Sequence, residues 1–168
     1  MTVIAFEGGL GSGKTLGMTF FLLSEQQYKN KKIYSNYKLD CPYEKLDMSQ
    51  ILAKMGELQD VAIGIDEIHI FMDSRMAVSK KNRLMSYFAL QTRKRNVSLY
   101  FTSQFLDQVD KRLRRLVDYR FLCESAGKDW FHYTMYDLTQ TTPRIRTFYL
   151  NGINLYERYS TDEIIDIE

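Results

Sequence analysis

The chain has 168 residues, of which 45% are hydrophobic and 26% charged, a composition ordinary for one globular domain with a buried core. Its formal net charge of +2 is too small to indicate a nucleic-acid-binding protein by itself. No apolar run approaches the length of a membrane span, and Glu7 interrupts the N-terminus too early for a signal peptide, so we expect a soluble chain. Cys41 and Cys123 have no metal-ligand spacing, which predicts reduced cysteines in a cytoplasmic compartment.

The first predicted element is a buried strand over the apolar residues 3–6, followed by a glycine-rich turn. The turn fits the pattern G-x-x-x-x-G-K-[ST] of a phosphate-binding loop. Its glycines accept positive φ and let the backbone approach a phosphate, whose charge suits the N–H groups at the start of a helix. We therefore predict that ATP binds to the loop formed by Gly8, Gly9, Leu10, Gly11, Ser12, Gly13, Lys14 and Thr15.

Two side chains of this loop have specific predicted tasks. Lys14 can reach the β- and γ-phosphates, and the hydroxyl of Thr15 can ligate Mg²⁺. The alternative is a flexible surface turn that is glycine-rich for other reasons. The position of the turn between a strand and a helix favours the phosphate loop.

The rest of the chain alternates between helix and strand. An almost wholly apolar helix ends near Tyr28, and being apolar on most sides it is expected to be buried against a sheet. The pattern predicts further strands over 33–37, 61–65, 97–102 and 119–124, helices over 48–55, 82–94 and 106–116, and loops over 40–47 and 71–79. This alternation is typical of an α/β fold with a mainly parallel sheet flanked by helices.

After residue 125 the pattern changes. Residues 130–138 and 144–150 are rich in β-forming residues, and turn-forming residues lie between them, which predicts an antiparallel hairpin at the sheet edge. Its aromatic run, 130–136, either stacks on bases or, more often in proteins, fills an edge sheet. The acidic end, 161–168, is a tail or a docking segment.

A pair of carboxylates follows the buried strand 61–65. In a phosphate-loop protein, Asp66 would support Mg²⁺ and Glu67 would orient or deprotonate the attacking water. The alternative is two acids that merely cap a strand end. A glutamate beside the aspartate favours hydrolysis over transfer to a small molecule. Gln104, just after the next strand, is predicted to sense the γ-phosphate, a strand-end turn being the alternative.

Together these motifs resemble a known group. They occur in the order Gly8–Thr15, Ile65-Asp66-Glu67-Ile68-His69, Gln91-Thr92-Arg93-Lys94-Arg95-Asn96, Thr102-Ser103-Gln104 and Asp110-Lys111-Arg112-Leu113-Arg114. In residues 1 to about 125 the chain resembles the FtsK–HerA superfamily of DNA-pumping ATPases. It is most similar to the zonula occludens toxin-like branch, which includes filamentous-phage assembly ATPases, and to viral genome-packaging ATPases.

The resemblance implies a RecA-like core, a ring that is often hexameric, and ATP hydrolysis that drives DNA movement. Lys14 and Thr15 would bind nucleotide, Asp66 and Glu67 would serve metal and water, and Gln104 would sense the γ-phosphate. Many toxin-like members carry a transmembrane segment and a further domain that we do not find here, which favours a compact packaging motor in the host cytoplasm. A capsid or membrane protein is a further conceivable partner.

Three basic clusters fit such a ring: 80–81, 93–95 and 111–115. A basic side chain can reach the neighbouring subunit's nucleotide or contact the DNA backbone, although solvated helix faces are the simpler explanation. For the first role we rank Arg93 and Arg95 ahead of Arg112, Arg114 and Arg115, with Arg75 as a further candidate.

Other functions remain as alternatives. One is a P-loop kinase of small molecules, and another is a nucleotide-dependent assembly or extrusion ATPase that does not pump DNA. Asp66-Glu67-Ile68-His69 also spells the DExH box of helicases, but those need two RecA-like domains in one chain. His69 is expected only to pack beside the acids, and His132 to be a core or surface residue.

Overall fold

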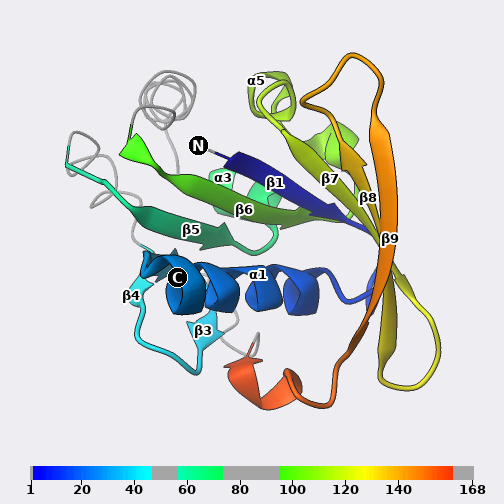
Figure 1. The fold of residues 1–168 in the computed structure, drawn as a ribbon, viewed down its shortest axis with the longest axis horizontal. Helices are drawn as coiled ribbons and strands as arrows, with labels where there is room; N and C mark the ends of the chain where they lie inside the picture. Colours follow the sequence, from blue (N-terminus) through cyan, green and yellow to red (C-terminus); the bar gives the residue numbers. More distant parts are fainter. Residues whose placement is uncertain (1, 47–56, 74–94, 161–168) are drawn as a thin grey trace.

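The structure is a computed structural model that describes residues 2–46, 57–73 and 95–160. In these ranges one sheet of eight strands has the order β4-β2-β5-β6-β1-β7-β8-β9 (Figure 1). The strands are β1 (Thr2–Glu7), β2 (Lys32–Ser35), β4 (Glu44–Lys45), β5 (Val61–Ile65), β6 (Ser98–Ser103), β7 (Tyr119–Ser125), β8 (Trp130–Asp137) and β9 (Arg144–Asn151). All neighbours from β4 to β7 are parallel, and β7, β8 and β9 are antiparallel, which confirms the predicted α/β fold.

The remaining elements are short, with one exception. Helix α1 (Lys14–Lys29) is long, while α3 (Ile68–Asp73), η2 (Leu106–Gln108), α5 (Lys111–Arg114) and η3 (Tyr156–Arg158) have one or two turns. A small antiparallel sheet joins β3 (Lys38–Leu39) to β10 (Tyr159–Ser160). No helix in the described ranges is long and apolar enough to cross a membrane.

The central strands β1, β5 and β6 of the large sheet are buried on both faces, because the side chains of a strand point alternately to each side. In β1, Ile4 and Phe6 pack in the core that includes Leu16, Met18 and Leu22 of α1. Val3 and Ala5 pack in the opposite core, with Ile68 of α3 and Leu113 of α5. Helix α1 therefore covers one face of the sheet, and α3 and α5 lie on the other.

The predicted elements are mostly present. The strands predicted over 3–6, 61–65, 97–102, 119–124, 130–138 and 144–150 are confirmed within one or two residues at either end, and the helix that follows the glycine-rich loop ends at Lys29. The strand predicted over 33–37 ends earlier, at Ser35. The loops were predicted too broadly, because β4 lies within 40–47 and α3 extends to residue 73. The predicted helices 48–55 and 82–94 and the tail 161–168 lie outside the described residues.

The helix predicted over 106–116 is wrong as a single element. It is divided into η2 and α5 by Val109, whose backbone is extended (φ −81°, ψ 142°). The reason is Asp110, whose carboxylate accepts a hydrogen bond from the Arg112 N–H at 2.8 Å and so caps a new helix. Aspartate is among the preferred residues for that position and a poor one for a helix interior.

Candidate functional site at the carboxyl edge of the sheet

Three predicted motifs meet at the carboxyl ends of β1, β5 and β6. The glycine-rich loop follows β1, the acid pair follows β5, and Gln104 follows β6. Strand β6 lies between the other two, with Glu7 of β1 opposite Ser103 and Ile65 of β5 opposite Phe101. In a parallel sheet, this alignment brings all three strand ends to one edge.

The glycine-rich loop closes over its own lysine. Gly11 and Gly13 have φ of 69° and 86°, values that glycine adopts at no steric cost, and Gly13 is the N-cap of α1. The Lys14 ammonium is buried and donates to the carbonyl of Gly9 at 2.9 Å. The Ser12 hydroxyl is also buried, with no hydrogen-bond partner among the described residues. A cation and an unpaired donor inside a backbone loop at a helix N-terminus fit a phosphate group.

Asp66 is held by two neutral hydroxyl groups. Thr15, in the first turn of α1, donates to its Oδ1 at 2.9 Å, and Thr102 of β6 donates to the same oxygen at 2.7 Å. The backbone of Asp66 is fixed as well, because the side-chain amide of Asn36 accepts from its N–H at 2.7 Å and donates to its C=O at 2.9 Å. Thr15 and Asp66, the two predicted metal ligands, are therefore in direct contact.

Glu67 lies in a constrained turn. Its φ is 47°, a left-handed conformation that is uncommon for residues other than glycine, and its N–H donates to Thr102 Oγ1 at 2.8 Å. Its carboxylate Oε2 lies 3.5 Å from Nδ1 of His69. His69 therefore packs beside the acid, as expected from the sequence.

Several residues that support the site were not recognised from the sequence. Tyr133 of β8 donates to the carbonyl of Gly13 at 2.7 Å, and its ring lies so close to Gly17 that a Cβ there would come within 2.5 Å of it. Glu7, at the end of β1, accepts from the N–H of Leu106 at 3.0 Å and from Nε of Arg120 at 2.7 Å. These partners are about a hundred residues apart in sequence, so no local pattern indicates them. Asn36 was detectable only as a polar residue at the end of a predicted strand.

Among the described residues, no predicted arginine has a hydrogen bond or ion pair with the loop or the acid pair. Arg95 comes before the amino end of β6, which at ~3.3 Å per residue is roughly 20 Å from the carboxyl edge. Arg93, Arg75 and the pair 80–81 lie outside the described residues. In the third cluster, Arg112 pairs with Asp110 at 2.9 Å and Arg114 with Asp107 at 3.5 Å. Gln104 directly follows β6 and is half-buried, at the edge where the acids lie.

The hairpin aromatics are divided between the core and the surface. Tyr133 is fully buried and stacks on Phe148, with ring centroids 5.1 Å apart, whereas Trp130 is exposed. His132 lies 3.4 Å from a carboxylate oxygen of Glu124, and its ring centroid is 4.8 Å from that of Tyr149. In the aromatic run 130–136, the residues that face inward therefore fill the edge of the sheet, and two of them, Phe131 and Tyr133, pack on Gly13 of the glycine-rich loop.

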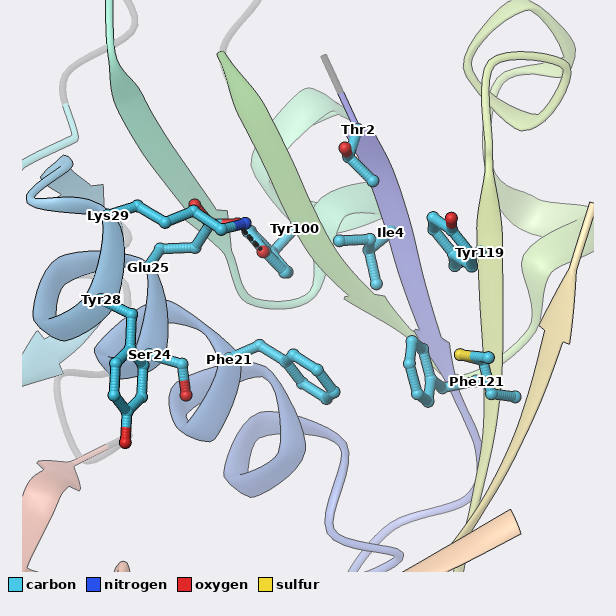
Figure 2. Close-up of a pocket in the computed structure, with 11 residues that line it drawn as sticks. Thr2, Ile4, Phe21, Ser24, Glu25, Tyr28, Lys29, Tyr100, Tyr119 and Phe121 are labelled. Carbon is cyan, nitrogen blue, oxygen red and sulfur yellow. Dashed lines mark hydrogen bonds and ion pairs between the residues drawn. The ribbon is translucent and has the colours of Figure 1, made fainter. Parts of the chain in front are cut away.

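A pocket of about 390 Å³ lies at the other end of α1 (Figure 2). Residues of α1 and of the first halves of β1, β6 and β7 line it, among them Phe21, Tyr28, Tyr100 and Tyr119. Figure 2 shows Glu25 and Lys29 extending from α1 toward Tyr100. The lining contains no residue of the predicted nucleotide site, so the two features are separate.

The donor set at the carboxyl edge fits a nucleotide with a hard divalent cation. Mg²⁺ takes oxygen ligands, uses few from the protein and keeps several waters, which one threonine hydroxyl and one aspartate can satisfy. Among the described residues there is no cluster of three or more His, Cys, Asp or Glu that would indicate an all-protein metal cage. Thr15 and Asp66 are therefore the residues that would hold Mg²⁺ together with phosphates.

No protein-family model matches the sequence, and no curated protein matches it. The fold is similar to the N-terminal domain of zonular occludens toxin from Neisseria meningitidis, with a TM-score of 0.71 and 16% identity over 95% of this chain and 98% of that one. It is also similar to the genome-packaging NTPase B204 of Sulfolobus turreted icosahedral virus 2 in complex with ATP-gammaS, with a TM-score of 0.58 and 9% identity over 86% of this chain and 96% of that one.

The DNA-packaging ATPase B204 of Sulfolobus turreted icosahedral virus gives a TM-score of 0.60 and 11% identity over 86% of this chain and 96% of that one. Identities this low establish the fold. The resemblance seen in the sequence motifs is thus confirmed at the level of the fold, and the chain has the RecA-like P-loop architecture of these proteins.

Proposed function

We propose that the chain is an ATPase that assembles into a ring and uses ATP hydrolysis to move DNA. The observation that carries the proposal is the direct contact between the phosphate loop and the acid pair, the 2.9 Å hydrogen bond from Thr15 to Asp66. In P-loop ATPases these two groups serve one metal ion. Their contact here favours a site for a nucleoside triphosphate with Mg²⁺ over a glycine-rich turn beside unrelated acids.

Each residue then has a chemical task. The loop N–H groups and Lys14 would bind the β- and γ-phosphates, and Thr15 and Asp66 would hold Mg²⁺. When bound, the metal offsets negative charge that develops on the phosphates. Glu67 would accept a proton from the attacking water, and Gln104 would contact the γ-phosphate or that water.

The ring is proposed because Arg95, one of the two arginines ranked first from the sequence, lies beyond the amino end of β6, whereas the acid pair lies at the carboxyl edge. Arg95 lies at the opposite edge of the sheet, so within one subunit it does not reach the acid pair. Arg95 would instead act on the site of a neighbouring subunit, and we propose the same role for Arg93 from the sequence. The remaining basic clusters would contact the DNA backbone, which needs charge but little sequence recognition.

DNA movement is supported by the similarity to the B204 packaging proteins of the two Sulfolobus turreted icosahedral viruses. The second candidate is a nucleotide-dependent assembly or extrusion ATPase that does not pump DNA. We keep this second candidate because the TM-score to the toxin domain is higher, 0.71, and the toxin-like branch that the sequence resembles includes filamentous-phage assembly ATPases. The acid pair argues against the small-molecule kinase, since a glutamate placed to activate water favours hydrolysis.

The test measures the ATPase rate with and without double-stranded DNA, together with the particle mass in the presence of nucleotide. We expect stimulation by DNA and a mass of several subunits. ATP hydrolysis and assembly without any response to DNA would favour the second candidate. A monomer with full activity at high dilution would contradict the ring.

A mixing experiment tests the arginines. Arg95→Ala and Arg93→Ala should each bind ATP yet hydrolyse it poorly, since such a cation contributes ~10³- to 10⁵-fold in rate where it has been dissected. Mixing either variant with Lys14→Ala should restore part of the activity, because some interfaces then pair an intact loop with an intact arginine. Absence of rescue would assign the arginines no role across the interface.

A further inference from the structure

In the described part of the chain, Thr102 is the one side chain that hydrogen-bonds to both members of the acid pair. Its hydroxyl donates to Asp66 Oδ1 at 2.7 Å and accepts from the N–H of Glu67 at 2.8 Å. A hydroxyl has one proton to donate, and here that proton goes to the carboxylate, while a lone pair receives the amide. The two bonds therefore fix the hydroxyl in one orientation.

The position of Thr102 is itself rigid. It is fully buried on β6, and β6 is paired on one side with β1 and on the other with β5. Its neighbour across the sheet is Phe6, the next-to-last residue of β1 before the phosphate loop. Thr102 thus holds the acid pair in register with the strand that leads into that loop.

Glu67 needs such support. Its left-handed backbone, φ 47°, is strained for a residue with a Cβ and persists only where the surroundings enforce it. The hydrogen bond from its N–H to Thr102 acts on this turn directly. Because the direction of a side chain follows from its backbone, losing this bond would change where the Glu67 carboxylate points.

We propose that Thr102 is a positioning residue for ATP hydrolysis, which holds the turn of Glu67 and the carboxylate of Asp66 in their working orientation. The inference rests on the proposed function, in which Glu67 is the general base. Thr102 does not touch the reacting atoms and acts through the two acids. The predicted sensor Gln104 lies two residues after Thr102, directly beyond the end of β6. The end of one strand therefore carries both the support for the acids and the predicted sensor.

The test replaces Thr102 with valine, which has nearly the same shape and no hydroxyl, and with serine, which keeps the hydroxyl. For Thr102→Val we expect kcat to fall by roughly 10- to 100-fold, because a small misplacement of a catalytic group has an effect of this size. KM for ATP should change by less than about twofold, since the phosphate loop is intact and Thr15 still donates to Asp66 Oδ1. Thr102→Ser should recover most of the lost rate.

The matched control is Ser98→Ala. Ser98 is an equally buried hydroxyl on β6, bonded to Lys31 at 2.7 Å, but it lies four residues away, roughly 13 Å from Thr102 along the strand. Ser98→Ala should lower the stability of the fold as Thr102→Val does, but it should leave kcat unchanged. Thermal unfolding of all three variants identifies any that is unfolded at the assay temperature, and its rate is then measured at a lower temperature.

A double-mutant cycle separates positioning from a merely structural role. In the Glu67→Gln background, adding Thr102→Val should lower the rate by clearly less than it does in the parent, because the base is already lost and only the effect through Asp66 remains. Full additivity of the two changes, or equal kcat values for Thr102→Val and Ser98→Ala, would overturn the inference while leaving the proposed ATPase intact. A parent chain that does not hydrolyse ATP at all would overturn the proposed function, and this inference with it.

Discussion

Helix α1 is joined to strand β6 at both of its ends, by a different chemistry at each. At its first turn, Thr15 and Thr102 of β6 both donate to Asp66. Near its last turn, the buried Glu25 pairs with Lys29 at 2.9 Å and Lys31 at 3.0 Å and accepts from Tyr100 of β6 at 2.7 Å. The first carboxylate is oriented by neutral donors, whereas the second is paired with cations.

We interpret this difference as one between the proposed metal site and a structural clamp. Neutral hydroxyl groups fix a carboxylate without cancelling its charge, so Asp66 remains able to attract a metal ion. Lysines offset the charge of Glu25: Lys29 donates a hydrogen bond to its Oε1, and the Lys31 ammonium forms an ion pair with its Oε2. A buried ion pair of this kind holds elements together in a defined arrangement and offers little to a ligand. Substitutions at the first end of α1 should therefore change ATP hydrolysis, and substitutions at its last turn should change stability.

The largest expected effect is at the phosphate loop. Lys14→Ala should abolish ATP hydrolysis and weaken nucleotide binding, because it removes the loop's cation. The matched control is Lys29→Ala at the other end of the same helix, which should keep the parent ATPase rate. Hydrolysis by Lys14→Ala at the parent rate would remove the phosphate-loop interpretation.

The acid pair should divide into two phenotypes. Glu67→Gln should bind MgATP but hydrolyse it ~10²-fold or more slowly, as expected for the loss of a general base. Asp66→Asn should instead lose the part of the nucleotide affinity that depends on Mg²⁺. Calorimetric titration of each variant with and without Mg²⁺, beside turnover rates, distinguishes them. Parent turnover in Glu67→Gln would exclude Glu67 as the base.

At the other end the expected effect is on stability. Glu25→Gln leaves the buried Lys31 without its anionic partner, which typically costs about 3–5 kcal/mol in the free energy of unfolding. Turnover per folded molecule should not change. Glu124→Gln, an exposed acid on β7, is the control and should leave the urea midpoint almost unaltered.

The ion pair of Glu25 with Lys31 also predicts how the stability of the fold depends on pH. Burial by itself raises the pKa of Glu25, but hydrogen bonds from Tyr100, Lys29 and Lys31 outweigh it, so the folded-state pKa lies below the ordinary value of 4.5. A lowered folded-state pKa stabilises the protein above the ordinary value, and this contribution is lost as the pH falls through the folded-state pKa. The stability difference between parent and Glu25→Gln should therefore shrink below pH 4.5. A difference that grows in acid would contradict the assignment.

The smallest expected effect concerns the support of the loop by the hairpin. Tyr133→Phe removes the hydrogen bond to Gly13 and keeps the ring packed on Gly17, so we expect a loss of about 1 kcal/mol in stability and a modest rise in KM for ATP. Tyr136→Phe, on the same strand, serves as the control. Equal KM values in the two variants would show that the hairpin does not tune the loop.

The sequence predicted the parts of the fold whose signal is local. The strand 61–65 was evident as an unbroken apolar run, and the hairpin as two β-rich runs around a turn. The helix over 106–116 was mispredicted because the apolar spacing of Val109 and Leu113 suits a helix, while the capping preference of Asp110 outweighs it. Local patterns identify which segments are regular but weigh such competing preferences poorly.

The sequence by itself determined the chemical groups of the site, since the order Gly-Lys-Thr, then Asp-Glu, then Gln can be seen without coordinates. Only the tertiary structure decided what holds those groups. Thr102, Asn36, Glu7 and Tyr133 act on residues 30 to 120 positions away, at distances set by strand order and register. Placement of β6 between β1 and β5 brings Thr102 against the acids. It also leaves Arg95 at the far edge, because parallel strands put the start of one strand at the opposite edge from the ends of its neighbours.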